Sequence, residues 1–286
     1  MKYRYLNSKE IHDDEESKFL KFLYNTFIGR FILKIVISKT ISKIVGIFLS
    51  SKLSLFMIKK YIKKYNIDMT KYEDKKYKSF NEFFKRKLKE DDFKSNKKDF
   101  ISTANSKITY YKIDKNLIIN IKKSKYNIEE ILKNKKMAEE YRDGICLIYR
   151  LAPQNYHRYI FCDDGELEYI GKVEGKLHTV KPIAINSKYK IFHENYREIS
   201  KLRTKEFGDI IQIEVGALCV GKIVNKKTDE FSKYQEKGYF EFGGSTIIQL
   251  IKKDKVKINN EIVENTKKDI ETLVDIGNII GEKYKI

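Results

Sequence analysis

The chain of 286 residues has no tryptophan, only two prolines and only three cysteines. The cysteines, Cys146, Cys162 and Cys219, show no paired spacing, and no Cys-x-x-Cys or histidine-rich ligand spacing occurs. These absences exclude a disulfide-based scaffold and argue against a structural zinc site or any other metal centre. Because the cysteines lie in or at the end of apolar runs, we expect buried, reduced thiols.

A long uncharged hydrophobic run is also missing. A membrane-spanning helix needs about 18 or more apolar residues nearly free of charge. Between residues 27 and 67, lysines at positions 34, 39, 43 and 52 interrupt the apolar stretches. Bulky apolar residues interleaved with lysine suit helices that lie in a membrane surface. The other interpretation is that these helices pack on the core with solvated lysines, and the residues alone leave both open.

Acidic residues are outnumbered by basic ones, 40 to 59, which gives a formal net charge of +19. Such an excess favours a polyanionic partner, either nucleic acid or an anionic membrane surface. The 20 tyrosines and 17 phenylalanines do not gather into an RNA-binding or zinc-finger pattern. We therefore expect no nucleic-acid partner. An anionic membrane surface, where each nearby lysine contributes about 1 kcal/mol, is the other polyanion that the charge allows.

The pattern of apolar residues changes along the chain. Helical periodicity predicts helices over residues 15–27, 29–38, 41–49, 52–65 and 80–87, the last preceded by Ser79 with Glu82 at the spacing of a capping box. After Ile101, β-branched and aromatic runs separated by polar turns predict strands, interrupted by one helix over residues 127–141. The predicted fold class is α+β, with a helical N-terminal membrane-contact region over residues 1–78 and a single β-rich core over residues 79–286.

Residues 242–246 (FGGST) join two strand-like runs through a pair of glycines. The tetrapeptide Gly-Gly-Ser-Thr, residues 243–246, is typical of a tight turn or bulge between paired strands. The same residues also suit a chemical role, because glycine permits backbone angles and close approaches that other residues do not. The hydroxyl of Ser245 is next to the carbonyl carbon of Gly244. Attack on that carbon, followed by elimination, would split the chain and leave a pyruvoyl group in place of the serine.

Five segments in a fixed order carry a resemblance to a known family. They are residues 79–88 (SFNEFFKRKL), 150–158 (RLAPQNYHR), 175–182 (GKLHTVKP), 215–223 (VGALCVGKI) and 242–246 (FGGST). Together they resemble the phosphatidylserine decarboxylase family, in particular its bacterial proenzymes. The resemblance runs from about residue 79 to residue 251 and extends more loosely to both ends. It implies a lyase of phospholipid biosynthesis that converts phosphatidylserine to phosphatidylethanolamine.

The resemblance also implies maturation by self-cleavage after Gly244. Residues 1–244 would form a β chain and residues 245–286 an α chain, held as a heterodimer, with a pyruvoyl cofactor made from Ser245. His157 matches a histidine that the family uses near the pyruvoyl centre, where an imidazole suits proton transfer. The implied location is the cytoplasmic face of the cell membrane, as a peripheral protein bound to its phosphatidylserine substrate and to anionic lipid. Homo-oligomerisation stays open.

Two positions depart from the family pattern. Asn105 stands where the family has an aspartate, and Ile160 stands where it has a second histidine, three residues after the first. In the family those two residues act with the serine as a triad that drives self-cleavage. Three interpretations follow. Cleavage proceeds slowly without the pair, or another base such as His178 or His193 replaces it, or the chain stays uncut as a lipid-binding pseudoenzyme.

Overall fold

The structure is a computed structural model, and it describes residues 2–14, 17–89, 93–122, 124–218 and 222–284. Its helices are α1 (Lys18–Asn25), α2 (Phe27–Val36), α3 (Lys39–Ser50), α4 (Phe56–Tyr65), α5 (Phe80–Phe84), α6 (Ile128–Leu132), α7 (Lys135–Glu139), α8 (Pro182–Ile185), α9 (Ile191–Glu194) and α10 (Asn260–Lys267). Short 3-10 turns, η1 (Lys52–Ser54) and η2 (Met69–Lys71), flank α4.

A ten-stranded sheet runs through the molecule in the order β13-β9-β10-β11-β15-β7-β4-β17-β1-β2. Its strands are β13 (Glu230–Phe231), β9 (Gly165–Val173), β10 (Arg197–Thr204), β11 (Gly208–Gly216), β15 (Ser245–Ile251), β7 (Ile145–Leu151), β4 (Ser106–Lys112), β17 (Ile270–Val274), β1 (Lys2–Tyr5) and β2 (Ile11–Asp13). Neighbouring strands are antiparallel except β1 and β17, which are parallel. The predicted α+β class is confirmed.

Three smaller sheets complete the core. They are β12-β14-β8, β16-β18-β3 and β5-β6. Their strands are β12 (Ile223–Asn225), β14 (Glu236–Phe240), β8 (Arg158–Ile160), β16 (Val256–Ile258), β18 (Ile279–Lys283), β3 (Asp99–Ile101), β5 (Ile118–Ile121) and β6 (Ser124–Asn127).

Strand β15 lies near the middle of the large sheet, and all seven of its residues are buried. Alternate side chains point to opposite faces of a strand. Accordingly, Ile247 and Ile251 join one apolar cluster, and Ile248 and Leu250 join another. The second cluster also takes in apolar residues of α6, α7 and α9, which cover that face. Because both faces are covered, β15 reads as a nearly continuous apolar run.

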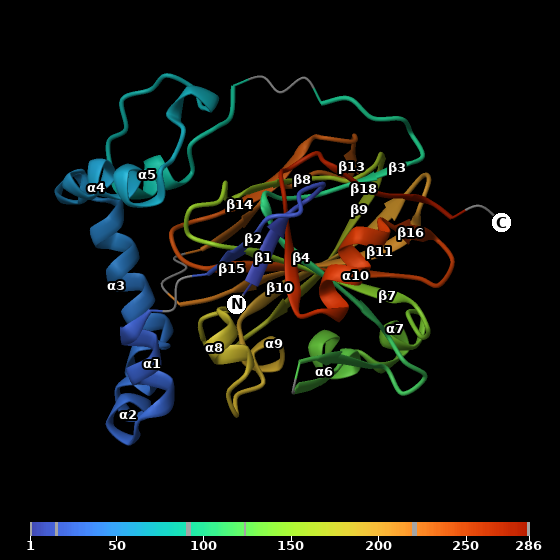
Figure 1. The fold of residues 1–286 in the computed structure, drawn as a ribbon, viewed down its shortest axis with the longest axis horizontal. Coiled ribbons are helices and arrows are strands. Elements are labelled where there is room, and N and C mark those ends of the chain that lie inside the picture. The colour runs from blue at the N-terminus through green and yellow to red at the C-terminus, as the bar shows by residue number, and fades with distance from the viewer. Residues whose placement is uncertain (1, 15–16, 90–92, 123, 219–221, 285–286) are drawn as a thin grey trace.

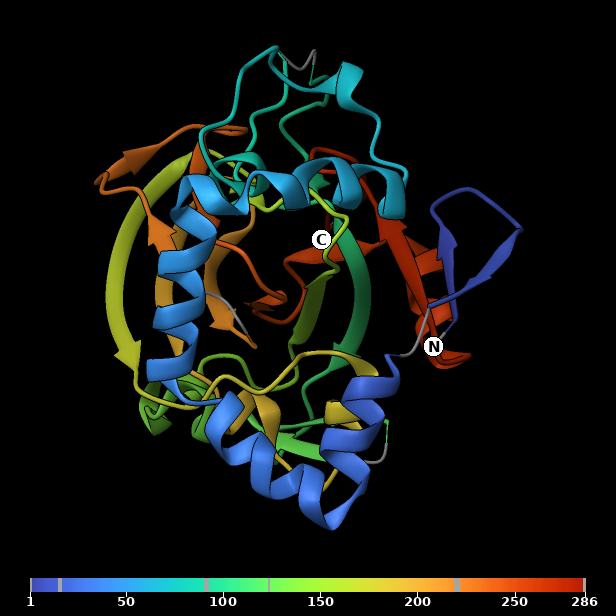
Figure 2. The same ribbon diagram turned by 90° about the vertical axis from the view of Figure 1, so that its left-hand side faces the viewer.

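The four N-terminal helices form a layer at one side of the sheet (Figures 1 and 2), and in Figure 2 they run as an arc in front of it. Ser17, Thr26 and Ser38 cap α1, α2 and α3 by accepting a hydrogen bond from a backbone N–H of the first turn. In the described residues, no single helix is long and apolar enough to cross a bilayer. The segments Lys39–Ser50 and Lys52–Tyr65 meet the length and composition required only as a pair bent by 80°.

The expectation that residues 1–78 are helical is wrong at its beginning. Residues Lys2–Tyr5 and Ile11–Asp13 form strands, and the first of them pairs with β17 near the other end of the chain. Asp14, just after β2, bonds to Lys107 and Arg150 and fixes this segment to the core. A partner so distant in sequence leaves no local periodic signal. The division of the chain at residue 79 stays a prediction.

The predicted helix over residues 127–141 is also interrupted. Lys133 adopts a left-handed backbone conformation, with φ of 54°, and ends α6. Asn134 then caps α7 by accepting a hydrogen bond from the N–H of Met137. The break is a local turn that the apolar periodicity of the segment does not reveal.

A buried ion pair crosses the interior between two sheets. Lys237 Nζ of β14 lies 2.9 Å from Glu214 Oε1 of β11, and both side chains are fully buried. The ammonium group also donates to Asn225 Oδ1 at 2.8 Å. Removing one member of such a pair leaves a buried charge without its counter-charge, which is costly.

Replacing Glu214 with Gln is therefore expected to lower the free energy of unfolding by about 3 to 5 kcal/mol. Denaturant unfolding would measure the change in a Ser245→Ala background, which removes the serine hydroxyl. The matched control is Glu168→Gln, which breaks the exposed pair with Arg203 and is expected to cost no more than about 1 kcal/mol. Equal losses in the two variants would contradict a buried, fully paired Lys237.

Candidate active site

Ser245 is the first residue of β15, opposite Gly216 of β11 and Leu151 of β7. Its side chain is fully buried. Two residues earlier, Gly243 has a φ of +143°, a conformation that residues with a Cβ rarely adopt. The glycine pair therefore lets the chain turn sharply into β15, as the turn interpretation expected. It also delivers the bond between residues 244 and 245 into the interior.

His157 lies against this serine. Its Nδ1 is 3.2 Å from Ser245 Oγ, and its Nε2 is 3.1 Å from the carbonyl oxygen of Ala152. A carbonyl oxygen can only accept a hydrogen bond, so Nε2 carries the imidazole proton and Nδ1 is the acceptor. Ser245 O–H then donates to Nδ1. The hydrogen-bond network thus assigns the tautomer in which the imidazole can take up the serine proton.

The surroundings of His157 keep it neutral. The ring is fully buried, and the ring of Phe84 lies with its centroid 4.2 Å away. Burial, together with a smaller effect of the positive charge of Arg86, lowers the pKa of His157 to about 3, and the hydrogen bond to the Ala152 backbone only partly opposes this shift. A charged imidazole is disfavoured in such a dry site. The group is therefore a neutral base over the whole physiological pH range.

The N-terminal helices hold the loops on both sides of this pair. Tyr61 of α4 donates a hydrogen bond of 2.6 Å to the carbonyl oxygen of Pro153, next to Ala152. Asn81 of α5 accepts one of 3.1 Å from the N–H of Phe242, just before the two glycines. The backbone positions around the serine and the histidine are thus fixed from the helical layer.

The two positions that depart from the family pattern do not touch Ser245 or His157 in any contact among the described residues. Ile160 packs in the apolar core, and its backbone pairs with Thr103. Asn105 accepts a hydrogen bond from Asn155 and donates one to Asp275. An aspartate–histidine pair is absent from these positions in the described chain. The serine instead faces His157, a residue that the sequence suggested only for the later proton transfer.

The two histidines suggested as replacement bases lie in other surroundings. His178 Nδ1 is 3.1 Å from the hydroxyl of Tyr24, and its Nε2 is 3.6 Å from a carboxylate oxygen of Glu194. Burial lowers the pKa of His178 to about 4. His193 packs edge-on against Tyr126. Among the described contacts of Ser245 Oγ, the only imidazole is that of His157.

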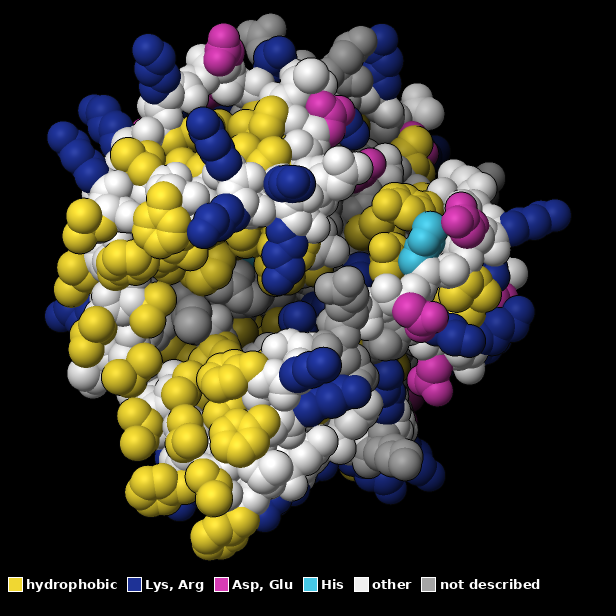
Figure 3. Space-filling model, turned by 60° about the vertical axis from the view of Figure 1, so that its left-hand side comes forward, with side chains coloured by type: hydrophobic (Ala, Val, Ile, Leu, Met, Phe, Trp, Pro, Cys, Tyr) yellow, Lys and Arg dark blue, Asp and Glu magenta, His cyan; other side chains and the backbone are white. Residues whose placement is uncertain are grey.

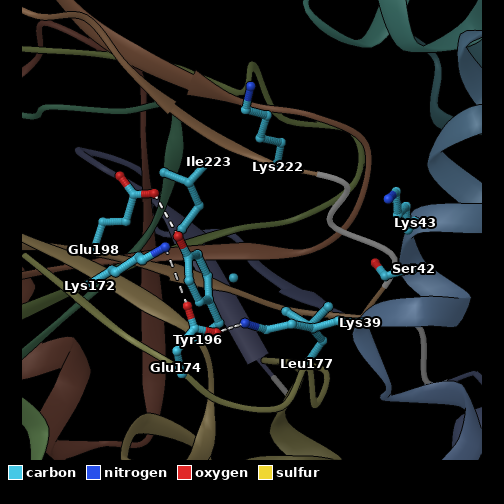
Figure 4. Close-up of a pocket in the computed structure, with 11 residues that line it drawn as sticks. Lys39, Ser42, Lys43, Lys172, Glu174, Leu177, Tyr196, Glu198, Lys222 and Ile223 are labelled. Carbon is cyan, nitrogen blue, oxygen red and sulfur yellow. Dashed lines mark hydrogen bonds and ion pairs between the residues drawn. The ribbon is translucent and has the colours of Figure 1, made fainter.

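A cavity of about 440 Å³ opens between α3 and the sheet, as Figure 4 shows. Gly216, the strand partner of Ser245, is part of its wall, and Ser245 itself is not one of the lining residues. Its lining residues are Lys39, Ser42, Lys43, Lys172, Glu174, Leu177, Tyr196, Glu198, Gly216, Lys222 and Ile223. Four lysines against two glutamates give the lining a net positive charge, and Glu174 pairs with both Lys39 and Lys172.

Asn155, Asn81 and Tyr61 are functional candidates that sequence reasoning missed. Asn155 accepts from the N–H of Ala152 at 2.8 Å and so shapes the loop beside His157. It stands inside the matched segment 150–158, which was the available signal, but nothing in the sequence gave it a role.

In the described residues no three or more His, Cys, Asp or Glu side chains gather as metal ligands. Cys146 and Cys162 are buried and unpaired, and Cys219 lies outside the described residues.

The depressed pKa of His157 makes stability depend on pH. Between pH 6.5 and about 3 the unfolded chain binds a proton that the folded chain does not, so this stabilisation is present above 6.5 and is lost as the pH falls. We expect the stability advantage of Ser245→Ala over Ser245→Ala/His157→Gln to shrink by about 2 to 3 kcal/mol between about pH 7 and pH 4.5. Denaturant unfolding at the two pH values measures it. A constant difference would contradict a buried neutral imidazole.

Comparison with known proteins places this arrangement in a family. Residues 80–282 match the family model described as phosphatidylserine decarboxylase. The chain is 48% identical to phosphatidylserine decarboxylase proenzyme 2 of Clostridium acetobutylicum over 279 residues, which cover 96% of each chain. It is 41% identical to the proenzymes of Clostridium tetani, over 98% of this chain and 97% of that one, and of Clostridium novyi, over 97% and 98%. With its serine, glycines and histidine arranged as described, the chain belongs to the phosphatidylserine decarboxylase family.

Proposed function

We propose that this protein is a proenzyme that cuts itself between Gly244 and Ser245 and then decarboxylates phosphatidylserine to phosphatidylethanolamine. The observation that carries the proposal is the contact between Ser245 Oγ and His157 Nδ1 in a fully buried site. The imidazole is neutral and holds the tautomer that accepts the serine proton. A base of this kind activates a serine hydroxyl for attack on a carbonyl carbon.

The steps of self-cleavage follow from this geometry. His157 Nδ1 takes the proton of Ser245 Oγ, and the oxygen attacks the carbonyl carbon of Gly244. The amide C–N bond breaks, the nitrogen takes up a proton, and an ester joins Gly244 to the serine oxygen. Loss of the α-proton of residue 245 and departure of the Gly244 carboxylate from Cβ then split the chain. Water replaces the nitrogen, which leaves as ammonia, and residue 245 becomes a pyruvoyl group.

The fold suits a cut at this bond. The segment after it contributes β15, β16, α10, β17 and β18, and β15 pairs on both sides with strands of the segment before it. The two products would therefore stay together as a heterodimer after the backbone is broken. A pyruvoyl group supplies an electrophilic ketone that accepts electrons while a bound amine loses carbon dioxide. His157, beside residue 245, is the side chain we assign to hold the proton that replaces the lost carboxylate.

The cavity beside Gly216 fits the polar part of such a lipid. Lys39, Lys43, Lys172 and Lys222 offer positive charge to a phosphate and a carboxylate, and Glu174 and Glu198 offer negative charge to an ammonium group. A second cavity of about 410 Å³ lies near Ala152, but it carries Asp13 and Asp14 in its wall. Lys64, Arg150 and Lys181 also line it, and Arg150 pairs with Asp14, so its excess of positive charge is smaller than that of the first cavity. We therefore assign the lipid headgroup to the first cavity.

The outer face of the helical layer suits a lipid surface, and we propose that the protein binds peripherally to an anionic membrane through it. The exposed apolar residues of this layer are Phe19, Phe22, Phe27, Ile28, Phe31, Ile35, Ile44, Ile47, Phe48, Leu53, Leu55 and Phe56. Figure 3 shows such side chains gathered on this side of the molecule, with lysine and arginine side chains beside them. Apolar burial and attraction to anionic lipid act together in such helices.

A second candidate is a lipid-binding protein of the same family that stays uncut. The observation in its favour is that neither Asn105 nor Ile160 supplies the charge and the base that the family pattern places there. Both candidates share the membrane face and the headgroup cavity. They differ in the covalent state of the purified chain.

Intact mass spectrometry of the purified protein separates the two candidates. We expect two fragments, one ending at Gly244 and one beginning with a pyruvoyl group at position 245. They should elute together under native conditions and separate under denaturing ones. Ser245→Ala and His157→Gln are expected to stay uncut. The cut protein should convert phosphatidylserine in vesicles to phosphatidylethanolamine with release of carbon dioxide. A single uncut mass for the wild-type chain would favour the pseudoenzyme.

The membrane face is tested by vesicle sedimentation. Phe27→Ser combined with Phe31→Ser should weaken binding to vesicles that contain phosphatidylserine by about tenfold or more, because each change removes about 1.5 to 3 kcal/mol of apolar burial. The control is Tyr169→Ser, which alters an exposed aromatic residue on β9, outside the helical layer. Unchanged binding of the double variant would remove the helical layer as the membrane face.

A further inference from the structure

A series of hydrogen bonds leads from Ser245 to a carboxylate at the molecular surface, in two runs that meet at the backbone of Ala152. Ser245 bonds to His157, and His157 bonds to the carbonyl oxygen of Ala152. The N–H of the same Ala152 donates to Asn155 Oδ1 at 2.8 Å. Asn155 Nδ2 donates to Asn105 Oδ1, and Asn105 Nδ2 donates to Asp275 Oδ1 at 2.5 Å.

Every donor in this chain points toward the carboxylate. The backbone N–H of Ala152 can only donate, so the Asn155 side chain must present its oxygen there and its NH₂ to Asn105. Asn105 must then present its oxygen to Asn155 and its NH₂ to Asp275. The two amide orientations are thereby fixed by the network. From the Ala152 N–H onward, hydrogen bonds aligned head to tail strengthen one another, and the negative charge of Asp275 at the accepting end favours this direction.

We infer that Asp275 takes over the part of the carboxylate that the family pattern places at position 105. It acts as a positioning residue through Asn105 and Asn155. Together these side chains hold Ala152 so that its carbonyl oxygen faces His157 Nε2 and keeps the proton on that nitrogen. The inference rests on the proposed self-cleavage, because it concerns the base of that reaction.

The fold explains how these contacts can link Asp275 to the more distant His157. Asp275 lies in the turn after β17, and its own N–H donates to Asn278 Oδ1 at 2.8 Å, which fixes the turn. Asn105 lies just before β4, the strand that pairs with β17. Asn155 lies in the loop after β7, the strand that pairs with β4 on the other side. Three neighbouring strands of one sheet therefore bring the three side chains into line at one edge of the site.

The test compares self-cleavage rates of freshly made precursor by mass spectrometry. Asp275→Ala removes the terminal acceptor and should slow the cut by about tenfold, the effect of one lost charged hydrogen bond. Asn105→Asp places two carboxylates next to each other, and their repulsion should slow self-cleavage as well. The exchange variant Asn105→Asp/Asp275→Asn restores one carboxylate and one amide in the pair and should recover a rate close to that of the wild type.

The matched control is Asp229→Ala, which removes an exposed aspartate in the loop before β13. It should cut at the wild-type rate. If Asp275→Ala also cuts at that rate, or if the exchange variant stays as slow as Asn105→Asp, the inference is overturned while the proposed function stands.

A second readout does not depend on cleavage. In histidine-labelled protein carrying Ser245→Ala, nitrogen NMR of the imidazoles reports which nitrogen of His157 holds the proton, with His157→Gln assigning the signal among the four histidines. We expect a single tautomer with the proton on Nε2, and a mixture of the two after Asp275→Ala. An unchanged single tautomer would overturn the positioning role. If the wild-type chain proves uncut, the proposed function fails, and this measurement still decides the inference.

Discussion

The structure depends on one water-excluded contact, between the hydroxyl of Ser245 and the neutral imidazole of His157. Burial makes the imidazole a weak base, since it lowers its pKa to about 3. The same burial removes competing water from the hydroxyl of Ser245, which is fully buried. In a site without water, the serine proton can be transferred without a strong base, provided that an acceptor is held in place while the C–O bond forms.

Much of the fold serves to hold that acceptor. The serine is fixed because it begins a strand that is paired on both sides and buried on both faces. The histidine is fixed by the Ala152 carbonyl and by Phe84. Tyr61 of α4 and Asn81 of α5 hold the neighbouring loops, and helices α1, α2 and α3 carry most of the exposed apolar residues. The N-terminal helices thus include both the contacts that support the site and the surface that we propose faces the lipid.

The sequence was sufficient for features that are local. The glycine pair, Ser245, the helices before residue 66 and the strands of the core were predicted from periodicity, caps and the matched segments. The pairing of β1 with β17 was missed, because its two partners are more than 260 residues apart. The resemblance had indicated His157 near the centre that forms from Ser245. The contacts that join Asn155, Asn105 and Asp275 were missed for the same reason as the strand pairing. They arise from neighbouring strands that the sheet, and not the chain order, brings together.

We expect the departures at Asn105 and Ile160 to weaken the proposed self-cleavage less than the corresponding losses would weaken a serine protease. In a serine protease, changing the triad aspartate to asparagine costs about 10⁴-fold, largely because the imidazole is held in the wrong tautomer. Here a backbone carbonyl holds the imidazole, and a carbonyl cannot reverse its role as an asparagine can. The proposed cut would also occur once in the life of each molecule, so a slow step would limit maturation and not turnover. A tautomer fixed by that carbonyl, in the position where we infer that Asp275 holds it, would then replace the directly bound charged partner.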